Sequence, residues 1–211
     1  MSLPLEQRSH REDIEGFAIF RSFLDRAAQA AMAEDLRAVI RAAPLVRFTT
    51  AWGKQMSVAM TSAGRLGWVI DRGRYRYADR HPETGAPWPA IPDSVMEVWQ
   101  AVSGWEAPPD CCLINWYREG AKMGLHQDKD EGDFRPPVVS ISLGDPARFR
   151  MGGTERKGPT SSTVLESGDV VVMGGEARLA YHGIDRVMFG QGDLLPDGGR
   201  INLTLRLVAG A

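Results

Sequence analysis

The chain has 211 residues, 43% of them apolar, so it can bury a sizeable core and is most simply one domain over residues 1–211. Its formal net charge of -2 at pH 7 argues against a dedicated nucleic-acid coating protein, because such proteins usually carry a strong excess of basic residues. No apolar run approaches the ~18 residues of a membrane-spanning helix, so we expect a cytoplasmic protein with no membrane partner. The two cysteines, Cys111 and Cys112, are adjacent and therefore poorly placed to form a disulfide bond.

The N-terminal part of the chain predicts a short strand and a helix. Residues 1–15 carry no clear apolar pattern, and we expect them to be flexible ahead of a strand at 17–20. Asp25 is a suitable N-cap for a helix that runs to about residue 42. The apolar residues of this helix fall on one face, which predicts that it packs against a sheet.

A second helix and an irregular segment follow. Val95, Val98 and Trp99 share one helical face, and we expect this helix to open near residue 93 and to close at Gly104. The segment 45–92 mixes a short predicted strand at 55–60 with scattered glycines and prolines, which is typical of a lid over a site.

The segment from residue 47 to residue 80 is locally basic. It contains seven basic residues and two acidic ones. Such a cluster either holds phosphates or is an ordinary solvated face, and its charge alone leaves both interpretations open.

The region 111–207 predicts a β-rich core. With 23 glycines and 13 prolines in the chain, short apolar runs alternate with turn residues, and no long helix interrupts them. The predicted strands span residues 111–117, 138–143, 148–151, 163–165, 169–173, 178–181 and 201–207. This spacing indicates a mainly β (α+β) fold: a double-stranded β-helix, or jelly roll, with buttressing helices.

Three residues form a candidate metal site. His126 and Asp128 are two positions apart, so in an extended chain both side chains point to the same face, and His182 follows a later predicted strand. Two imidazoles and one carboxylate leave open coordination positions and suit non-haem Fe(II) oxygenases. A zinc hydrolase and a non-catalytic cupin-like binding module remain alternatives, although the helical H-E-x-x-H motif of many zinc hydrolases is absent.

The last predicted strand carries a candidate clamp for a dicarboxylate. Arg200, Asn202, Thr204 and Arg206 alternate with apolar residues, so one face of the strand is polar and cationic. Two guanidinium groups with Cα atoms ~20 Å apart along a strand can turn inward and hold the two ends of a short dicarboxylate. The alternative is a solvent-facing strand with ordinary surface charges.

Four motifs follow one another along the chain: Asn115-Trp116-Tyr117, His126-Gln127-Asp128, Tyr181-His182-Gly183 and Arg200-x-Asn202-x-Thr204-x-Arg206. In order and spacing they resemble the AlkB-type DNA dealkylation dioxygenases. Further matching stretches are 56–61, 66–68, 87–90, 112–115, 120–122, 129–131 and 168–172. The resemblance covers roughly residues 15–207. One departure is Met173, where the bacterial prototype has a tryptophan.

The resemblance implies a set of residue roles. His126, Asp128 and His182 would hold Fe(II). Arg206 with Asn115 would bind the 2-oxoglutarate carboxylate nearest the metal. Arg200, with Tyr117 and Asn202, would bind the distal carboxylate. O2 is the other co-substrate that this family implies.

The resemblance also implies a substrate. Trp68 and Tyr75 would contact a flipped base and its backbone, Asp130 would face the charge of a methylated base, and Arg156 would hold phosphates. The activity would be oxidative demethylation of 1-methyladenine and 3-methylcytosine type lesions in DNA, possibly RNA, with release of formaldehyde. The alternative is a 2-oxoglutarate-dependent hydroxylase of a protein or small molecule. We expect a monomer without an obligate protein partner.

Overall fold

A computed structural model describes residues 10–50, 53–71 and 73–208, and within them it contains three antiparallel β-sheets and two α-helices. The largest sheet has seven strands in the order β1-β2-β11-β8-β13-β6-β3. Their bounds are β1 (His10–Ile14), β2 (Phe17–Arg21), β11 (Val170–Met173), β8 (Val138–Gly144), β13 (Arg200–Arg206), β6 (Cys111–Tyr117) and β3 (Ala59–Gly64). β13 lies between β8 and β6, so its side chains are held on both flanks.

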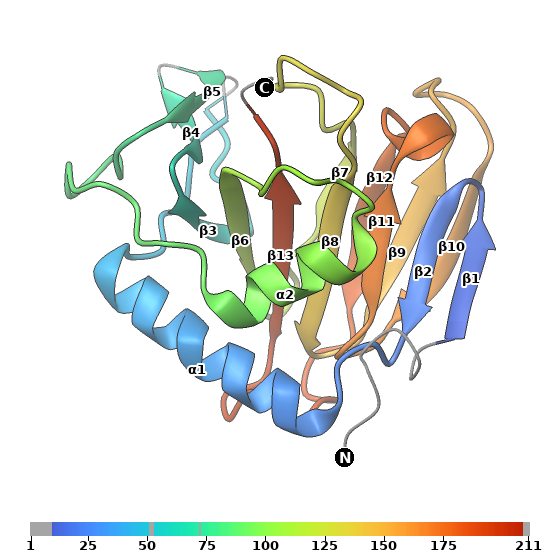
Figure 1. Cartoon of the computed structure of the whole chain (residues 1–211), viewed down its shortest axis with the longest axis horizontal. Coiled ribbons are helices and arrows are strands. Elements are labelled where there is room, and N and C mark those ends of the chain that lie inside the picture. Colours follow the sequence, from blue (N-terminus) through green and yellow to red (C-terminus); the bar gives the residue numbers. More distant parts are fainter. Residues whose placement is uncertain (1–9, 51–52, 72, 209–211) are drawn as a thin grey trace.

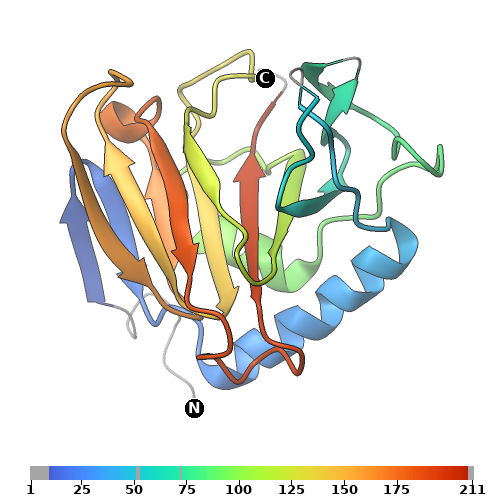
Figure 2. The ribbon, with the colours of Figure 1, turned by 180° about the vertical axis from the view of Figure 1, so that it is seen from behind.

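A four-stranded sheet faces the seven-stranded one, as Figures 1 and 2 show from opposite sides. Its order is β10 (Thr160–Leu165), β9 (Ala147–Gly152), β12 (His182–Val187) and β7 (Met123–His126). Phe17 of β2 meets Phe149 of β9 edge to face, with ring centroids 5.7 Å apart. The two sheets thus share a buried apolar interior, and the described chain is mainly β.

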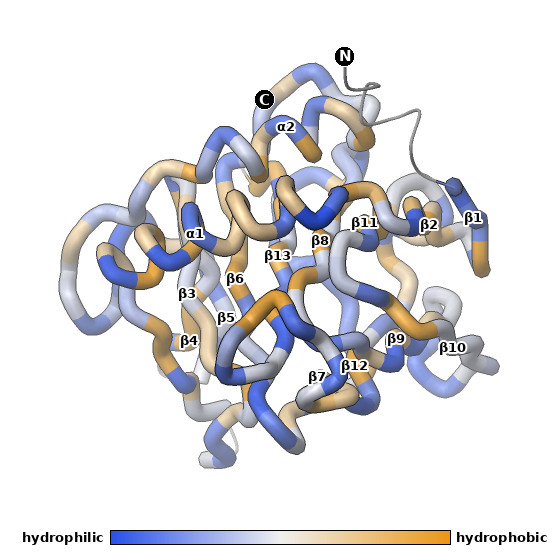
Figure 3. Tube along the Cα trace, turned by 90° about the horizontal axis from the view of Figure 1, so that it is seen from below, coloured by the Kyte–Doolittle hydropathy of each residue, from blue (hydrophilic) through white to orange (hydrophobic). Residues whose placement is uncertain are grey.

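Both helices cover the outer face of the seven-stranded sheet (Figure 1). They are α1 (Arg26–Ala42) and α2 (Asp93–Val102). Asp25 caps α1, because its side chain accepts a hydrogen bond from the Ala28 amide at 2.9 Å. Met32 and Leu36 are fully buried against the sheet, and the hydropathy along α1 alternates in Figure 3. The prediction that the two helices act as buttresses is confirmed.

The third sheet is the hairpin of β4 (Gly67–Asp71) and β5 (Arg74–Ala78). Trp88 anchors it, since its indole lies against Gly67, where a Cβ would clash, and donates a hydrogen bond to the Ala78 carbonyl at 2.8 Å. Glycine at position 67 therefore permits the close approach of hairpin and indole. The hairpin falls inside the segment 45–92.

The structure corrects three sequence expectations. Residues 10–14 form β1, so the expectation of a flexible segment 1–15 is wrong there, and residues 1–9 lie outside the described part. The strand expected at 55–60 instead occupies Ala59–Gly64. The strand expected at 178–181 is wrong, because a 3-10 helix at Gly175–Ala177 and a turn precede β12. No helix in the described ranges is long and apolar enough to cross a membrane.

Candidate active site

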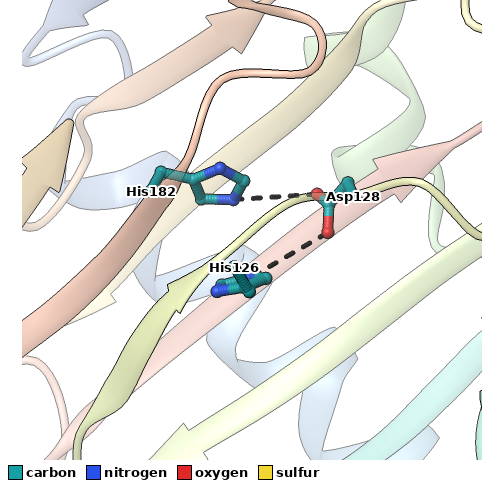
Figure 4. Close-up of side chains that lie close together, drawn as sticks. All are labelled: His126, Asp128 and His182. Carbon is teal, nitrogen blue, oxygen red and sulfur yellow. Dashed lines mark ion pairs between the residues drawn. The ribbon is translucent and has the colours of Figure 1, made fainter. Parts of the chain in front are cut away.

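The three candidate metal ligands converge on one point (Figure 4). His126 ends β7, and it is paired in register with His182, which begins β12. Asp128 follows in the loop after β7. Its carboxylate oxygens lie 3.9 Å from His126 Nε2 and 3.8 Å from His182 Nε2, and one ligand atom from each residue fits within 4.8 Å of the others. The antiparallel pairing of β7 with β12 therefore brings together histidines 56 positions apart.

Backbone carbonyls orient both imidazoles. His126 Nδ1 lies 2.9 Å from the Gly124 carbonyl oxygen, and His182 Nδ1 lies 3.1 Å from that of Ala180. A nitrogen facing a carbonyl at this distance must carry the proton, which leaves the lone pair on each Nε2. Histidine ligands of metals are commonly held in this way by their second nitrogen.

The charges around Asp128 keep it ionised. Burial opposes ionisation, but Arg206, His182 and His126 outweigh it and hold the pKa of Asp128 far below its usual range. Arg206 donates a hydrogen bond to Asp128 Oδ1 at 2.8 Å. Burial, followed by repulsion from His126, lowers the pKa of His182 to about 4. At neutral pH Asp128 is therefore an anion and His182 is neutral, as metal ligands must be.

A cavity of about 400 Å³ opens beside these ligands. All twelve candidate site residues line it: Trp68, Tyr75, Asn115, Tyr117, His126, Asp128, Asp130, Arg156, His182, Arg200, Asn202 and Arg206. Met173 is also part of the wall and is almost fully buried. Residues from the segment 45–92, the loop after β7 and both facing sheets thus meet around one space.

The alternation along β13 sorts its residues between two environments. Arg200, Asn202, Thr204 and Arg206 line the cavity. Ile201, Leu203 and Leu205 belong to the core beneath the helices. The interpretation of β13 as a surface strand with ordinary charges is therefore wrong, because both arginines are buried.

The two arginines are strongly buried yet incompletely bonded. Arg200 is fully buried, and the only hydrogen bond of its side chain within the described residues is from Nη2 to Ser142 Oγ at 2.7 Å. Arg200 Nε and Nη1, Arg206 Nε, Asn115 Oδ1 and Asp128 Oδ2 are buried without a hydrogen-bond partner in that part of the chain. Burial lowers the pKa of Arg200 to about 10.

These unpartnered groups test whether the site suits a metal and a dicarboxylate. A buried cation without a partner is costly, and a carboxylate offers the bidentate acceptor that a guanidinium matches. Asp128 Oδ2 and the two Nε2 atoms supply the mixed nitrogen and oxygen donor set of non-haem iron. The residues present therefore fit Fe(II) and 2-oxoglutarate together.

Asn115 and Asn202 form the polar floor between the arginines. They face each other across β6 and β13, with Asn115 Nδ2 3.4 Å from Asn202 Oδ1. Asn202 Nδ2 already donates to Ser140 Oγ at 2.7 Å. Tyr117 is buried nearby, and burial raises its pKa, so its hydroxyl stays protonated at neutral pH.

An aromatic pair lies at the cavity mouth. The rings of Trp68 and Tyr75 are stacked, with centroids 5.2 Å apart and an interplanar angle of 23°. Trp68 Nε1 donates to Asp130 Oδ2 at 3.1 Å, so an indole edge and a carboxylate meet at the entrance. Tyr75 and Arg156 are exposed at the same opening.

The sequence did not predict a buried polar network that lies behind the metal site. Tyr77 donates a short hydrogen bond to Glu131, which also accepts from Arg178 at 3.1 Å and lies 3.5 Å from Arg206 Nε. Arg178 further donates to the Asp128 carbonyl at 2.7 Å. Glu131 belongs to the acidic run 128–131, which could have drawn attention to it, but no local pattern in the sequence marks Arg178. The network connects the hairpin to Asp128 through Arg206.

Comparisons with known proteins agree with this geometry. Residues 16–206 match the model of the 2OG-Fe(II) oxygenase superfamily. An alpha-ketoglutarate-dependent dioxygenase AlkB homolog from Caulobacter vibrioides is 55% identical over 193 residues, covering 92% of this chain and 88% of that protein. Alpha-ketoglutarate-dependent dioxygenase AlkB from Escherichia coli is 46% identical over 195 residues, covering 90% and 89%.

A solved structure supports the same assignment. The structure of OsALKBH1 matches with a TM-score of 0.76 and 30% sequence identity, over 93% of this chain and 99% of that chain. The family match over residues 16–206 includes both histidines, which lie on the four-stranded sheet, and Asp128 in the loop after β7. The chain therefore belongs to the AlkB group of the 2OG-Fe(II) oxygenase superfamily, whose members are dioxygenases that use Fe(II), 2-oxoglutarate and O2.

Proposed function

We propose that this enzyme removes methyl groups from ring nitrogens of nucleobases, with 1-methyladenine and 3-methylcytosine type lesions in DNA as its main substrates. The observation that carries the proposal is the meeting of Trp68 and Asp130 at the mouth of the metal cavity. A base methylated at these nitrogens is cationic, and both an indole face and a carboxylate attract a cation. Direct reversal of alkylation damage would be the biological role, and RNA carrying the same lesions is a second substrate to test.

We assign the metal and co-substrate roles from the donor atoms that the cavity offers. His126, Asp128 and His182 hold Fe(II). Arg206 with Asn115 binds the carboxylate of 2-oxoglutarate nearest the metal, and Arg200 with Tyr117 and Asn202 binds the distal one. The unpartnered guanidinium nitrogens described above support this division. When bound, Fe(II) and 2-oxoglutarate would activate O2, with one oxygen atom going to the N-methyl carbon and the other to succinate as CO2 is released.

The protein positions the substrate and protects the reaction. Met60, Phe149, Leu165 and Met173 form apolar walls that limit water around the reacting methyl group. The hydroxylated methyl group leaves as formaldehyde, so no protein nucleophile is needed. Met173 is more flexible than a tryptophan, and we propose that it admits a wider range of alkyl groups.

The target base must leave the helix to reach this cavity. A base in a duplex cannot present its methyl group to an enclosed metal, so the enzyme takes a single strand or extrudes the nucleotide. Trp68 would then contribute ~1 to 2 kcal/mol by contact with the cationic ring. Tyr75 and Arg156, exposed at the opening, are placed to hold the adjoining backbone.

We also propose the corresponding organisation of the fold. The two facing sheets within 111–207 would be the double-stranded β-helix core, and the segment 45–92 with its hairpin would be a nucleotide-recognition lid. All of these belong to one domain, 1–211, that acts as a monomer. The shared cavity, lined from both sheets and the hairpin, supports this division.

A substrate panel tests the proposal. Purified enzyme with Fe(II) and 2-oxoglutarate is incubated with single- and double-stranded DNA and RNA oligonucleotides that carry one methylated base. We expect loss of the methyl group by mass spectrometry and release of formaldehyde. Turnover of 2-oxoglutarate without demethylation of any oligonucleotide would contradict the proposal and favour a hydroxylase of a protein or small molecule.

A further inference from the structure

A second, strongly cationic groove lies on the outer face of the four-stranded sheet. Its volume is about 740 Å³. Its charged lining consists of five basic side chains and one acidic side chain: Lys122, Arg148, Arg150, Arg156, Arg186 and Asp185. We call this feature the outer basic groove. Its charge is opposite in sign to that of the whole chain, which has a net charge of -2 at pH 7.

The strand pattern of β9 places two of these charges outside. Ala147, Phe149 and Met151 are buried between the sheets, so Arg148 and Arg150 point to the outer face. Their Cα atoms are ~7 Å apart along the strand. The sequence thus presents a pair of guanidinium groups on the side of the sheet away from the catalytic ligands.

The pairing of β9 with β12 adds a third guanidinium. Arg186 of β12 lies directly opposite Arg148, across a bulge in the register. Like charges in directly opposed positions destabilise a sheet, so this pair opposes folding unless an anion lies between or near the two side chains. Both side chains are exposed and reachable from solvent.

The anions within the protein neutralise little of this charge. Asp185 forms an ion pair with Arg150 at 2.8 Å. Within the described part of the chain, Arg148, Arg156 and Arg186 make no ion pair. The groove therefore retains a positive surplus, which suits a partner that carries several negative charges.

The outer basic groove adjoins the catalytic cavity. Met123, Leu125, Arg156 and Ile184 line both spaces. A strand whose target nucleotide enters the cavity near Arg156 would reach the groove past this side chain. The groove is therefore placed to receive chain that adjoins the target nucleotide.

We propose that the outer basic groove binds the phosphodiester backbone that flanks the target nucleotide, on the same strand. The inference rests on the proposed function, since it presumes a nucleic-acid substrate. Guanidinium groups bind phosphate oxygens in a bidentate manner, and such contacts carry no sequence information. The groove would raise affinity for long substrates at any sequence, as a repair enzyme requires.

The test compares substrate lengths with a variant that spares the cavity. Arg148→Gln with Arg186→Gln removes two of the three arginines that form no ion pair. It leaves the Arg150 ion pair and Arg156, at the cavity opening, unchanged. The matched control is Arg37→Gln with Arg41→Gln, which removes the same charge from exposed positions on α1, on the opposite side of the molecule. Each is assayed by formaldehyde release on a methylated trinucleotide and on a single strand about 15 nucleotides long.

We expect the groove variant to lose about tenfold in kcat/KM on the long strand and to keep wild-type kcat/KM on the trinucleotide. On the long strand, log kcat/KM should decrease less steeply with log salt concentration in the groove variant. The magnitude of this negative slope should be smaller by about 1.4, because two phosphate contacts are lost and each contributes ~0.7 on a single strand. The control variant should match wild type on both substrates.

Two results would overturn the inference. One is wild-type activity of the groove variant on the long strand, and the other is an equal loss on both substrates. If wild type demethylates neither substrate, the proposed function fails. Binding of an unmodified long strand, measured by fluorescence anisotropy, then still tests the groove, because an unchanged Kd in the groove variant would refute it.

Discussion

Replacing Asp128 with alanine should remove both catalysis and a substantial part of the stability, whereas replacing His126 should remove catalysis alone. Asp128 is buried and accepts a hydrogen bond from the buried Arg206 at 2.8 Å. The side chain of His126 is 40% exposed, and the one described hydrogen bond of its imidazole is to a backbone carbonyl two residues away. Both side chains can therefore bind the metal, but only Asp128 also stabilises the fold.

The magnitudes follow from the burial of the ion pair. Removing one member of a buried pair costs ~3 to 5 kcal/mol, and Glu131, 3.5 Å from Arg206 Nε, compensates in part, so we expect about 3 kcal/mol for Asp128→Ala. For a chain of this size that corresponds to a fall in Tm of roughly 6 to 12 °C. His126→Ala should cost less than about 1 kcal/mol, as for other partly exposed positions.

The assay is thermal denaturation of the metal-free proteins in the presence of a chelator, with conversion of 2-oxoglutarate to succinate measured separately. Both variants should be inactive. Asp128→Asn serves as a control that removes the charge but keeps the volume, and its Tm should lie near that of Asp128→Ala. Equal Tm values for Asp128→Ala and His126→Ala would refute the reasoning that the Arg206 pair stabilises the fold.

Three further predictions concern the contact of Arg200 with 2-oxoglutarate, the contact of Trp68 with the methylated base, and the pH dependence of stability. Arg200→Met should raise the KM for 2-oxoglutarate by roughly 10- to 100-fold, because a charge-assisted contact is lost, yet raise the Tm of the ligand-free protein by removing a buried, incompletely bonded cation; a lower Tm would count against this. Trp68→Ala should raise the KM for a methylated oligonucleotide about tenfold and leave the KM for 2-oxoglutarate unchanged; equal effects on both would argue against base contact. His182 has a folded pKa of about 4, below the ~6.5 of an unfolded histidine, so the unfolded chain alone takes up a proton between these values. The free energy of unfolding of the metal-free protein should therefore decrease by about 3 kcal/mol as pH falls through this window, and urea denaturation of His182→Gln should show a smaller decrease.

The helices and the clamp strand were predictable because their signals are local. The cap at Asp25 and the apolar face of α1 depend on neighbours three or four positions apart. The period of two along Arg200–Arg206 needs only the strand itself. Short-range periodicity of this kind is enough to assign each residue to one face of its helix or strand.

The strand expected at 178–181 failed for the opposite reason. Arg178 lies outside regular strand structure because its guanidinium reaches Pro136, Asp128 and Glu131, more than 40 positions earlier in the chain. A short apolar run cannot reveal such contacts. The same holds for the pairing of His126 with His182 and of Arg148 with Arg186, since sheet register is set by long-range packing.

If the cavity demethylates nucleobases, conversion of 2-oxoglutarate to succinate must be coupled to release of formaldehyde. Succinate and formaldehyde are measured together with wild-type enzyme, Fe(II), 2-oxoglutarate and a single-stranded oligonucleotide containing 1-methyladenine. We expect one formaldehyde for each succinate above the background without oligonucleotide, and loss of both products in His126→Ala. Succinate formation that is unchanged by the methylated oligonucleotide, with no formaldehyde released, would contradict the proposed demethylation.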